Sequence, residues 1–232
     1  MGRRKKNFIL ENVEITDVAA EGKCLGRVDD KVVFVPYTIP GDLVDIRITK
    51  NKKNYYEGKV EKFHSYSDQR QEPFCKHFGT CGGCKWQMMS YDKQLEVKHQ
   101  TVVDHLERLG GFKDLNFLPI SGSSTDRFYR NKLEFTFTPT RWLTNEQMHS
   151  GDEFERRGVG FHIPGGFDKV LDIDKCFLQD DFSNHVKNEI RGYLLQHDLT
   201  CYNIRQHHGL LRNLIIRSTS LGDRMVIIQF GE

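Results

Sequence analysis

The sequence has no long apolar run and little excess of charge of one sign. Nowhere does it approach the ~20 consecutive apolar residues that a membrane-spanning helix needs. Its basic start is followed only by Phe8, Ile9 and Leu10, which is too short for the apolar part of a secretory signal peptide. We therefore expect a cytoplasmic protein that has no membrane partner.

The formal net charge is only +2 and is unevenly distributed. Residues 1–66 hold 13 basic and 10 acidic side chains, whereas the remaining 166 residues hold 21 and 22. This is weak support for a polyanionic partner, because the clustering of cations on one face matters more than their sum. A solvated surface accounts for the composition equally well.

Residues 1–65 have the strand and turn pattern of a small OB-like β-barrel. Turn residues separate short apolar or alternating runs, and Pro40-Gly41-Asp42 forms one such turn. Strands of this length and spacing suit a five-stranded barrel. The four runs that we identify are residues 8–15, 31–35, 43–48 and 55–63.

Cations and aromatic rings meet at one turn of this barrel. The turn 51–54 contains Lys52 and Lys53 and is followed by Tyr55 and Tyr56. RNA-binding barrels use such neighbours to hold the backbone and to stack bases. An exposed basic hairpin beside two strand tyrosines is the alternative. The candidate RNA contacts of the barrel are Arg47, Lys52, Lys53 and Tyr55.

Residues 66–232 predict an α+β domain with an antiparallel sheet, because helices and strands do not alternate strictly. One helix begins after Ser90, carries an apolar stripe through Leu109 and ends at Gly110-Gly111. The final apolar strand ends two residues before the sequence does, so we expect a piece of a longer chain. The other predicted elements are a helix at 180–197 and strands at 133–138, 158–163, 169–174, 211–218 and 224–230.

Three cysteines, Cys75, Cys81 and Cys84, fall within ten positions. Thiolates this close in sequence can converge on one site, and a tetrahedral or cubane metal centre requires a fourth ligand. Cys176 follows a predicted strand end and is the best candidate. We interpret Cys24 and Cys201 as small buried hydrophobes.

Three kinds of site compete for this group. A disulfide suits a cytosolic chain poorly, and zinc ribbons usually contain two C-x-x-C pairs where this chain has one. An iron–sulfur cluster suits three cysteines of one loop with a remote fourth. Gly82 and Gly83 would also let backbone N–H groups approach the sulfur atoms. The spacing favours the cluster and leaves zinc and no metal open.

The motifs together resemble the 23S rRNA (uracil-5-)-methyltransferase family. The similarity covers nearly the whole chain, through C-x5-C-G-G-C with D-I-x-x-C at 172–176, YRNK at 129–132 and LLRNLIIRS at 210–218. The front module resembles a TRAM domain, whose P-G-D-x-V turn appears at 40–44. The resemblance implies a [4Fe-4S] cluster held by Cys75, Cys81, Cys84 and Cys176.

The resemblance also implies that the catalytic part is missing. In the family, a C-terminal Rossmann-like domain binds S-adenosylmethionine, and a cysteine there attacks uracil C6 so that C5 can take the methyl group. Here the G-x-G at 158–160 lacks the third glycine and the helix of a cofactor turn. We therefore expect no catalytic or cofactor-binding residue in residues 1–232 and no activity from them alone.

The leading hypothesis is the RNA-binding, cluster-bearing N-terminal part of an RNA uracil-5-methyltransferase that forms 5-methyluridine in 23S rRNA and is a monomer. Arg130, Asn131 and Lys132 would approach the RNA near its target loop; solubility of a strand end is the alternative for them. A stand-alone, non-catalytic RNA-binding protein that holds a metal is the alternative function. The radical methylthiotransferases also combine TRAM-type barrels with clusters, but their C-x3-C-x2-C is absent.

Overall fold

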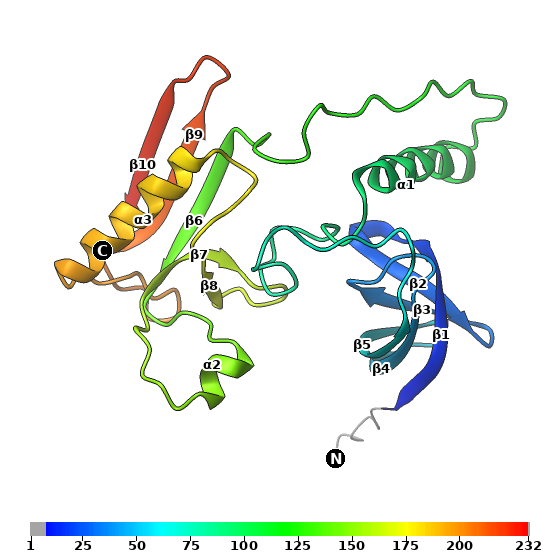
Figure 1. Ribbon diagram of the computed structural model, residues 1–232, viewed down its shortest axis with the longest axis horizontal. Coiled ribbons are helices and arrows are strands. Elements are labelled where there is room, and N and C mark those ends of the chain that lie inside the picture. Colours follow the sequence, from blue (N-terminus) through cyan, green and yellow to red (C-terminus); the bar gives the residue numbers. More distant parts are fainter. Residues whose placement is uncertain (1–7, 232) are drawn as a thin grey trace. The chain divides into compact units, whose positions relative to one another are not determined.

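The computed structural model describes residues 8–231, and Figure 1 shows its helices and strands. The chain forms two compact units. The first contains the residues up to Phe74 together with Lys85–Ser123, and the second contains Cys75–Cys84 together with the residues from Ser124 onward. The cysteine loop therefore belongs to the second unit, although the first unit flanks it in sequence. The predicted domain boundary between residues 65 and 66 stays a prediction.

The first unit contains the closed five-stranded barrel that the sequence predicts, with the strand order β1-β2-β3-β5-β4. Alternation decides which side chains form its core. Val44, Ile46 and Ile48 of β4 are buried, whereas Arg47 between them is exposed. The strands are β1 (Ile9–Val18), β2 (Lys23–Val28), β3 (Lys31–Pro36), β4 (Leu43–Asn51) and β5 (Tyr55–Ser65).

Strand β2 is the barrel strand that the sequence pattern did not reveal. It is short and carries Gly26 where an apolar side chain would complete the alternation. A Cβ at this position would lie 2.6 Å from the carbonyl oxygen of Glu14 on β1, so glycine lets the two backbones approach closely. Backbone packing rather than side-chain pattern therefore marks this strand.

The first unit continues with α1 (Tyr91–Asp104) and a π-helical turn, η2 (His105–Leu109). As predicted, Ser90 caps the helix, and its Oγ accepts a hydrogen bond from the Lys93 amide at 3.4 Å. The helical segment ends at Gly110, again as predicted.

The apolar stripe of α1 is present as predicted, but no residue of this helix is buried. Its first turns are partly covered by the segment that returns past them. Leu95 lies against Gly122, and the Tyr91 hydroxyl accepts from the Ser123 amide at 2.8 Å. Val102, farther along the stripe, is 53% exposed.

The second unit is built on a five-stranded antiparallel sheet with the order β10-β9-β6-β7-β8. The predicted hairpin around Pro164 and the predicted helix at 180–197 are confirmed, whereas the short α2 was not predicted. No helix within residues 8–231 has both the length and the apolar character of a membrane span. The elements are β6 (Lys132–Thr138), α2 (Asn145–His149), β7 (Gly158–His162), β8 (Val170–Asp172), α3 (Asp181–Gln196), β9 (Leu211–Ser218) and β10 (Arg224–Phe230).

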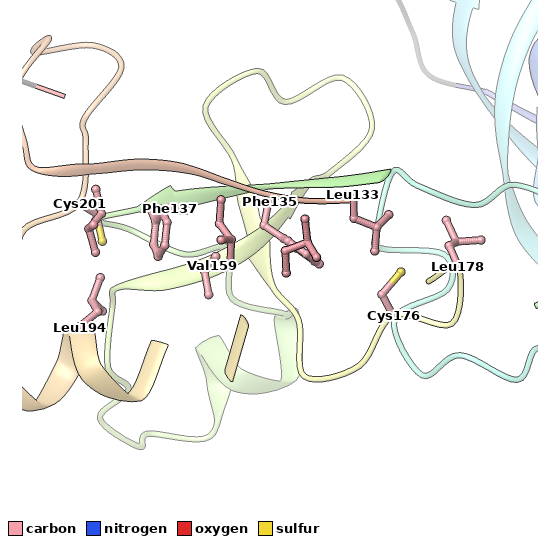
Figure 2. Close-up of a cluster of buried hydrophobic side chains, with 11 residues drawn as sticks. Leu133, Phe135, Phe137, Val159, Cys176, Leu178, Leu194 and Cys201 are labelled. Carbon is pink, nitrogen blue, oxygen red and sulfur yellow. The ribbon is translucent and has the colours of Figure 1, made fainter. Parts of the chain in front are cut away.

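One face of this sheet carries the core of the second unit. Leu133, Phe135 and Phe137 alternate along β6, are buried and belong to one cluster with Leu194 of α3 (Figure 2). The residues between them on β6 point to the opposite face. The sheet therefore has an apolar face under α3 and a second face of different composition.

Candidate functional site

The four cysteines predicted as metal ligands all belong to the second unit. Cys176 follows β8, is 8% exposed and lies toward one end of the core, whereas Cys201 lies at the other end (Figure 2). Cys84 packs against the same core. None of the six cysteines of the chain forms a disulfide.

The structure brings the four predicted ligands close enough for their charges to interact. Burial raises the pKa of Cys81 to about 11, and charges on Cys84, Cys176 and Cys75 contribute to the rise. Burial also raises the pKa of Cys176, again with contributions from Cys84 and Cys75. Cys81 and Cys176 are therefore protonated near neutral pH, and a bound metal would have to displace those protons.

Two glycines shape the loop between Cys81 and Cys84. The Gly83 amide donates to Cys81 Sγ at 3.4 Å, which is the role that the sequence predicts for these glycines. The Gly82 amide instead donates to the carbonyl oxygen of His162 at 3.0 Å, and a Cβ on Gly82 would lie 2.6 Å from that oxygen. Gly82 therefore ties the loop to the end of β7.

The chemistry of this donor set fits a thiolate-bound metal. Four cysteine side chains, three from one loop and one from a remote segment, are the ligand type of an iron–sulfur cluster. Within residues 8–231, no three His, Cys, Asp or Glu side chains already stand as a metal-binding group. The thiols would therefore have to draw together around a cluster, and their role as ligands stays a prediction.

A buried lysine on α3 lies near Cys176. Lys187 is fully buried, and its Nζ donates to the Ile173 carbonyl and to Asn188 Oδ1, the latter at 2.6 Å. Burial lowers the pKa of Lys187 from 10.5 to about 8, and the carboxylate of Asp172 opposes that shift. The Lys187 ammonium group therefore loses its proton at a lower pH in the folded protein than in the unfolded chain.

The free energy of unfolding should rise between pH 8 and pH 10.5 by a contribution from Lys187. In that window the unfolded chain binds the lysine proton and the folded chain releases it, so stability is gained as pH rises and lost as pH falls toward 8. Lys187→Met should remove this contribution, whereas Lys175→Met, at a partly exposed lysine of the same unit, should keep it. Urea unfolding at several pH values measures both variants. Equal pH dependence of the two variants would contradict the assignment.

The P-G-D turn of the barrel holds a buried carboxylate. Asp42 is fully buried and accepts hydrogen bonds from the amides of Ile39 and Ser67 at 2.8 and 3.0 Å. Arg70 donates to both of its oxygens, at 3.2 and 2.9 Å. Gly41 supplies the turn with its φ of +92°. Through Asp42, the P-G-D turn thus binds Ser67 and Arg70 of the segment that follows the barrel.

The barrel cations predicted to contact RNA lie at the surface. Lys52 and Lys53 are exposed at the tip between β4 and β5. Arg47 is exposed too, but its Nε donates to Glu61 Oε2 at 2.7 Å, so a carboxylate already neutralises part of its charge. Lys52 and Lys53 are therefore the better placed of the three for phosphate groups.

The two tyrosines after this tip differ in their surroundings. Tyr56 packs against the barrel core and makes an edge contact with Phe8, with ring centroids 5.7 Å apart. Tyr55 is half-buried outside that core cluster and contacts the ring of Phe34 at 5.8 Å. Tyr56 therefore contributes to the packing of the barrel core. For Tyr55, stacking on an RNA base stays a prediction.

Arg130, Asn131 and Lys132 are exposed at the start of β6 in the second unit. The Arg130 amide donates to the carbonyl of Leu178 at 2.8 Å, and the Asn131 carbonyl accepts from the Ser218 amide at 2.9 Å. Burial raises the pKa of Cys176 and the charge of Arg130 opposes that rise, so this predicted RNA contact lies near a predicted cluster ligand. Their contact with RNA stays a prediction.

The glycines at 158–160 do not form a cofactor turn. They lie within β7, which pairs with β8 instead of leading into a helix. A Cβ on Gly160 would lie 2.0 Å from the carbonyl oxygen of Leu171, so this glycine serves the packing of neighbouring strands. These residues do not fit S-adenosylmethionine.

The curated relatives that this sequence matches are about twice as long as the chain. The family model of the TRAM domain matches residues 5–60, which confirms the predicted front module. A protein from Bacteroides thetaiotaomicron named as an uncharacterized RNA methyltransferase is 50% identical over 212 residues, covering 91% of this chain and 47% of the relative. A protein of the same name from Porphyromonas gingivalis is 46% identical over 224 residues, covering 94% and 48%. The chain thus spans about half the length of these curated relatives.

A solved structure with a similar fold indicates how far the likeness extends. It is the Pyrococcus abyssi tRNA (uracil-54, C5)-methyltransferase in complex with S-adenosyl-L-homocysteine, with a TM-score of 0.63. The two chains are 22% identical, and the match covers 95% of this chain and 46% of the other. At this identity the likeness shows the fold alone.

Proposed function

We propose that residues 1–232 are the RNA-binding part of an RNA uracil-5-methyltransferase and that the residues for methyl transfer lie outside this sequence. The observation that carries the proposal is the similarity to proteins named RNA methyltransferases, which covers over nine-tenths of this chain but under half of each relative. The TRAM match supports RNA as the partner, and the name of the similar solved structure supports uracil C5 as the target. The proposed substrate is 23S rRNA.

The proposal includes a [4Fe-4S] cluster with a structural role. Its support is that Cys75, Cys84 and Cys176 contribute to the raised pKa of Cys81, together with the chemistry of cysteine thiolates as cluster ligands. A cluster at this place would join the loop 75–84 to the segment after β8. Alone, residues 1–232 should bind RNA without forming 5-methyluridine when S-adenosylmethionine is added.

Replacing Lys52 and Lys53 together with alanine should weaken binding to an RNA hairpin with a single-stranded loop. Cations at an exposed tip act mainly by releasing counterions, so the slope of log affinity against log salt should fall by ~0.7 for each lost contact. Tyr55→Leu should instead cost about 1–3 kcal/mol of binding free energy with little change of slope. Fluorescence anisotropy of labelled RNA at several salt concentrations measures both quantities.

The matched control replaces Lys98 and Lys113, which are exposed lysines of the same unit, with alanine. This control removes the same charge and should leave affinity and slope nearly unchanged. A folded Lys52/Lys53 variant that binds like the control would remove the barrel tip from the RNA interface. A hairpin from 23S rRNA and one from tRNA, compared in the same assay, test the proposed substrate.

A further inference from the structure

The second unit contains a pocket that none of the predicted site residues lines. It has a volume of about 650 Å³. Its floor is the face of the sheet opposite α3, where Thr136 and Thr138 of β6, His162 of β7 and Asn213 of β9 contribute polar side chains. Its walls are the segments 139–143, 167–169 and 202–205. The pocket thus combines a hydrogen-bonding floor with loop walls.

Cations dominate the charged side chains of this pocket. Five are Lys or Arg, against the two carboxylates Glu134 and Asp168. Arg205 pairs with Asp168 at 2.5 Å. Within residues 8–231, Arg156, Lys169 and Arg212 have no carboxylate at ion-pair distance. Lys169 and Arg212 are exposed and each lies beside an aromatic ring. The five cations are Arg141, Arg156, Lys169, Arg205 and Arg212.

Three aromatic side chains stand next to these cations. Lys169 Nζ lies 4.7 Å from the ring centre of Trp142, and the guanidinium of Arg212 lies 4.7 Å from that of Tyr202. Phe167, the third ring, is 66% exposed. Rings for stacking bases and cations for the backbone are the two elements with which proteins hold single-stranded nucleic acid.

The pocket continues into a predicted RNA contact along β6. Lys132 lies on the same face of the strand as Glu134, Thr136 and Thr138, because successive side chains alternate. In the sheet, Lys132 stands opposite Arg217 of β9, so a pair of cations extends the same face beyond the pocket. From Lys132 to Thr138 the strand runs ~20 Å.

We propose that this pocket holds an unstacked nucleotide of single-stranded RNA, with its base on the Trp142 or Tyr202 ring and its phosphate on Lys169 and Arg212. The adjoining backbone runs along β6 toward Lys132 and Arg217. The floor side chains Thr136 and Asn213 offer hydrogen bonds to the base edge. The inference rests on the proposed RNA-binding function and gives it a second contact surface, separate from the tip of the barrel.

The test uses Trp142 as a reporter. The chain has two tryptophans, so Trp86→Phe leaves Trp142 as the only one. In that background, a 12-nucleotide oligouridine should quench the Trp142 emission as it binds. Lys169→Ala with Arg212→Ala should abolish the quenching and lower the salt slope by ~0.7, which corresponds to the one phosphate that the two cations hold. Trp142→Leu, in the chain that keeps Trp86, should weaken binding about fivefold or more without changing the slope.

The matched control is Lys175→Ala with Arg224→Ala, which removes two cations of the same unit outside the pocket. It should bind and quench like the parent. If oligouridine bound Lys169→Ala/Arg212→Ala as tightly as it binds this control and quenched the Trp142 emission equally, the proposed nucleotide site in the pocket would be overturned. Weaker binding by the Lys52/Lys53 variant in the same assay would still support the proposed RNA-binding function. Absence of RNA binding by the parent overturns both. Uridine 5′-monophosphate or polyglutamate that competes as well as oligouridine would show a free-nucleotide or general anion site and would also overturn the proposal. Circular dichroism checks that each variant is folded.

Discussion

Anaerobic reconstitution of the chain with ferrous iron and sulfide should give a brown protein with about four irons per molecule. Cys176→Ser should lower the iron content as far as Cys81→Ser does, although the two positions lie 95 residues apart in the sequence. The reason is that both thiols belong to the group whose charges interact. Iron and sulfide analysis with the visible absorption spectrum measures the outcome.

Cys201 provides the matched control for this experiment. It is 4% exposed and belongs to the same buried cluster as Cys176, but Figure 2 shows it at the other end of the core. Cys201→Ala should therefore retain the iron. Loss of iron in Cys201→Ala as well would mean that a damaged core, and not a missing ligand, explains the serine variants.

Two outcomes would reject the cluster. Stoichiometric zinc without iron or sulfide would assign the four thiols to a zinc site, which the sequence spacing alone left open. Equal iron content in the parent and in Cys176→Ser would remove Cys176 from the ligands. With the cluster bound, the loop 75–84 should also resist proteolysis better, because a metal shared with Cys176 ties it to a remote segment.

Local patterns predicted most of the secondary structure. The alternation of apolar residues in β4 and β6 agrees with the observed burial, since a strand with one covered face must place every second residue in the core. Ser90 and Gly110 marked the limits of a helical segment because both act through backbone hydrogen bonds at its ends. Burial of Cys24 and Cys201 was also correctly predicted, although Cys24 additionally donates to the Thr38 carbonyl at 2.8 Å.

Features that depend on distant backbone or on several segments were not predictable. Strand β2 was missed because Gly26 interrupts its apolar pattern. The glycine allows close approach of the backbone to Glu14, and this contact is evident only in the folded barrel. The stripe of α1 had the periodicity of a buried face, but periodicity does not say whether another element covers it. The pocket of the second unit joins short loops with the polar residues of three strands, and no single segment carries a motif for it.

Asp42→Ala should lower the free energy of unfolding of the first unit by about 3–5 kcal/mol. The carboxylate is fully buried and receives two amide hydrogen bonds besides the two from Arg70. Its removal leaves a half-buried guanidinium without its counter-charge and two amide donors without acceptors, and each of these losses is unfavourable. Arg70→Lys should cost less, because it keeps the charge but loses the bidentate geometry.

Trp86 makes the measurement specific to the first unit. In a Trp142→Phe background it is the only tryptophan and belongs to that unit, so its emission during urea unfolding follows the barrel and its attachments. Glu61→Gln is the matched control, since it removes one carboxylate of an exposed ion pair on the same barrel, and such pairs contribute little. If Asp42→Ala unfolded at the same urea concentration as Glu61→Gln, the P-G-D turn would not fasten the segment after the barrel. A large shift confined to Asp42→Ala would make the turn a structural anchor, from which the chain passes through residues 67–70 toward the cysteine loop.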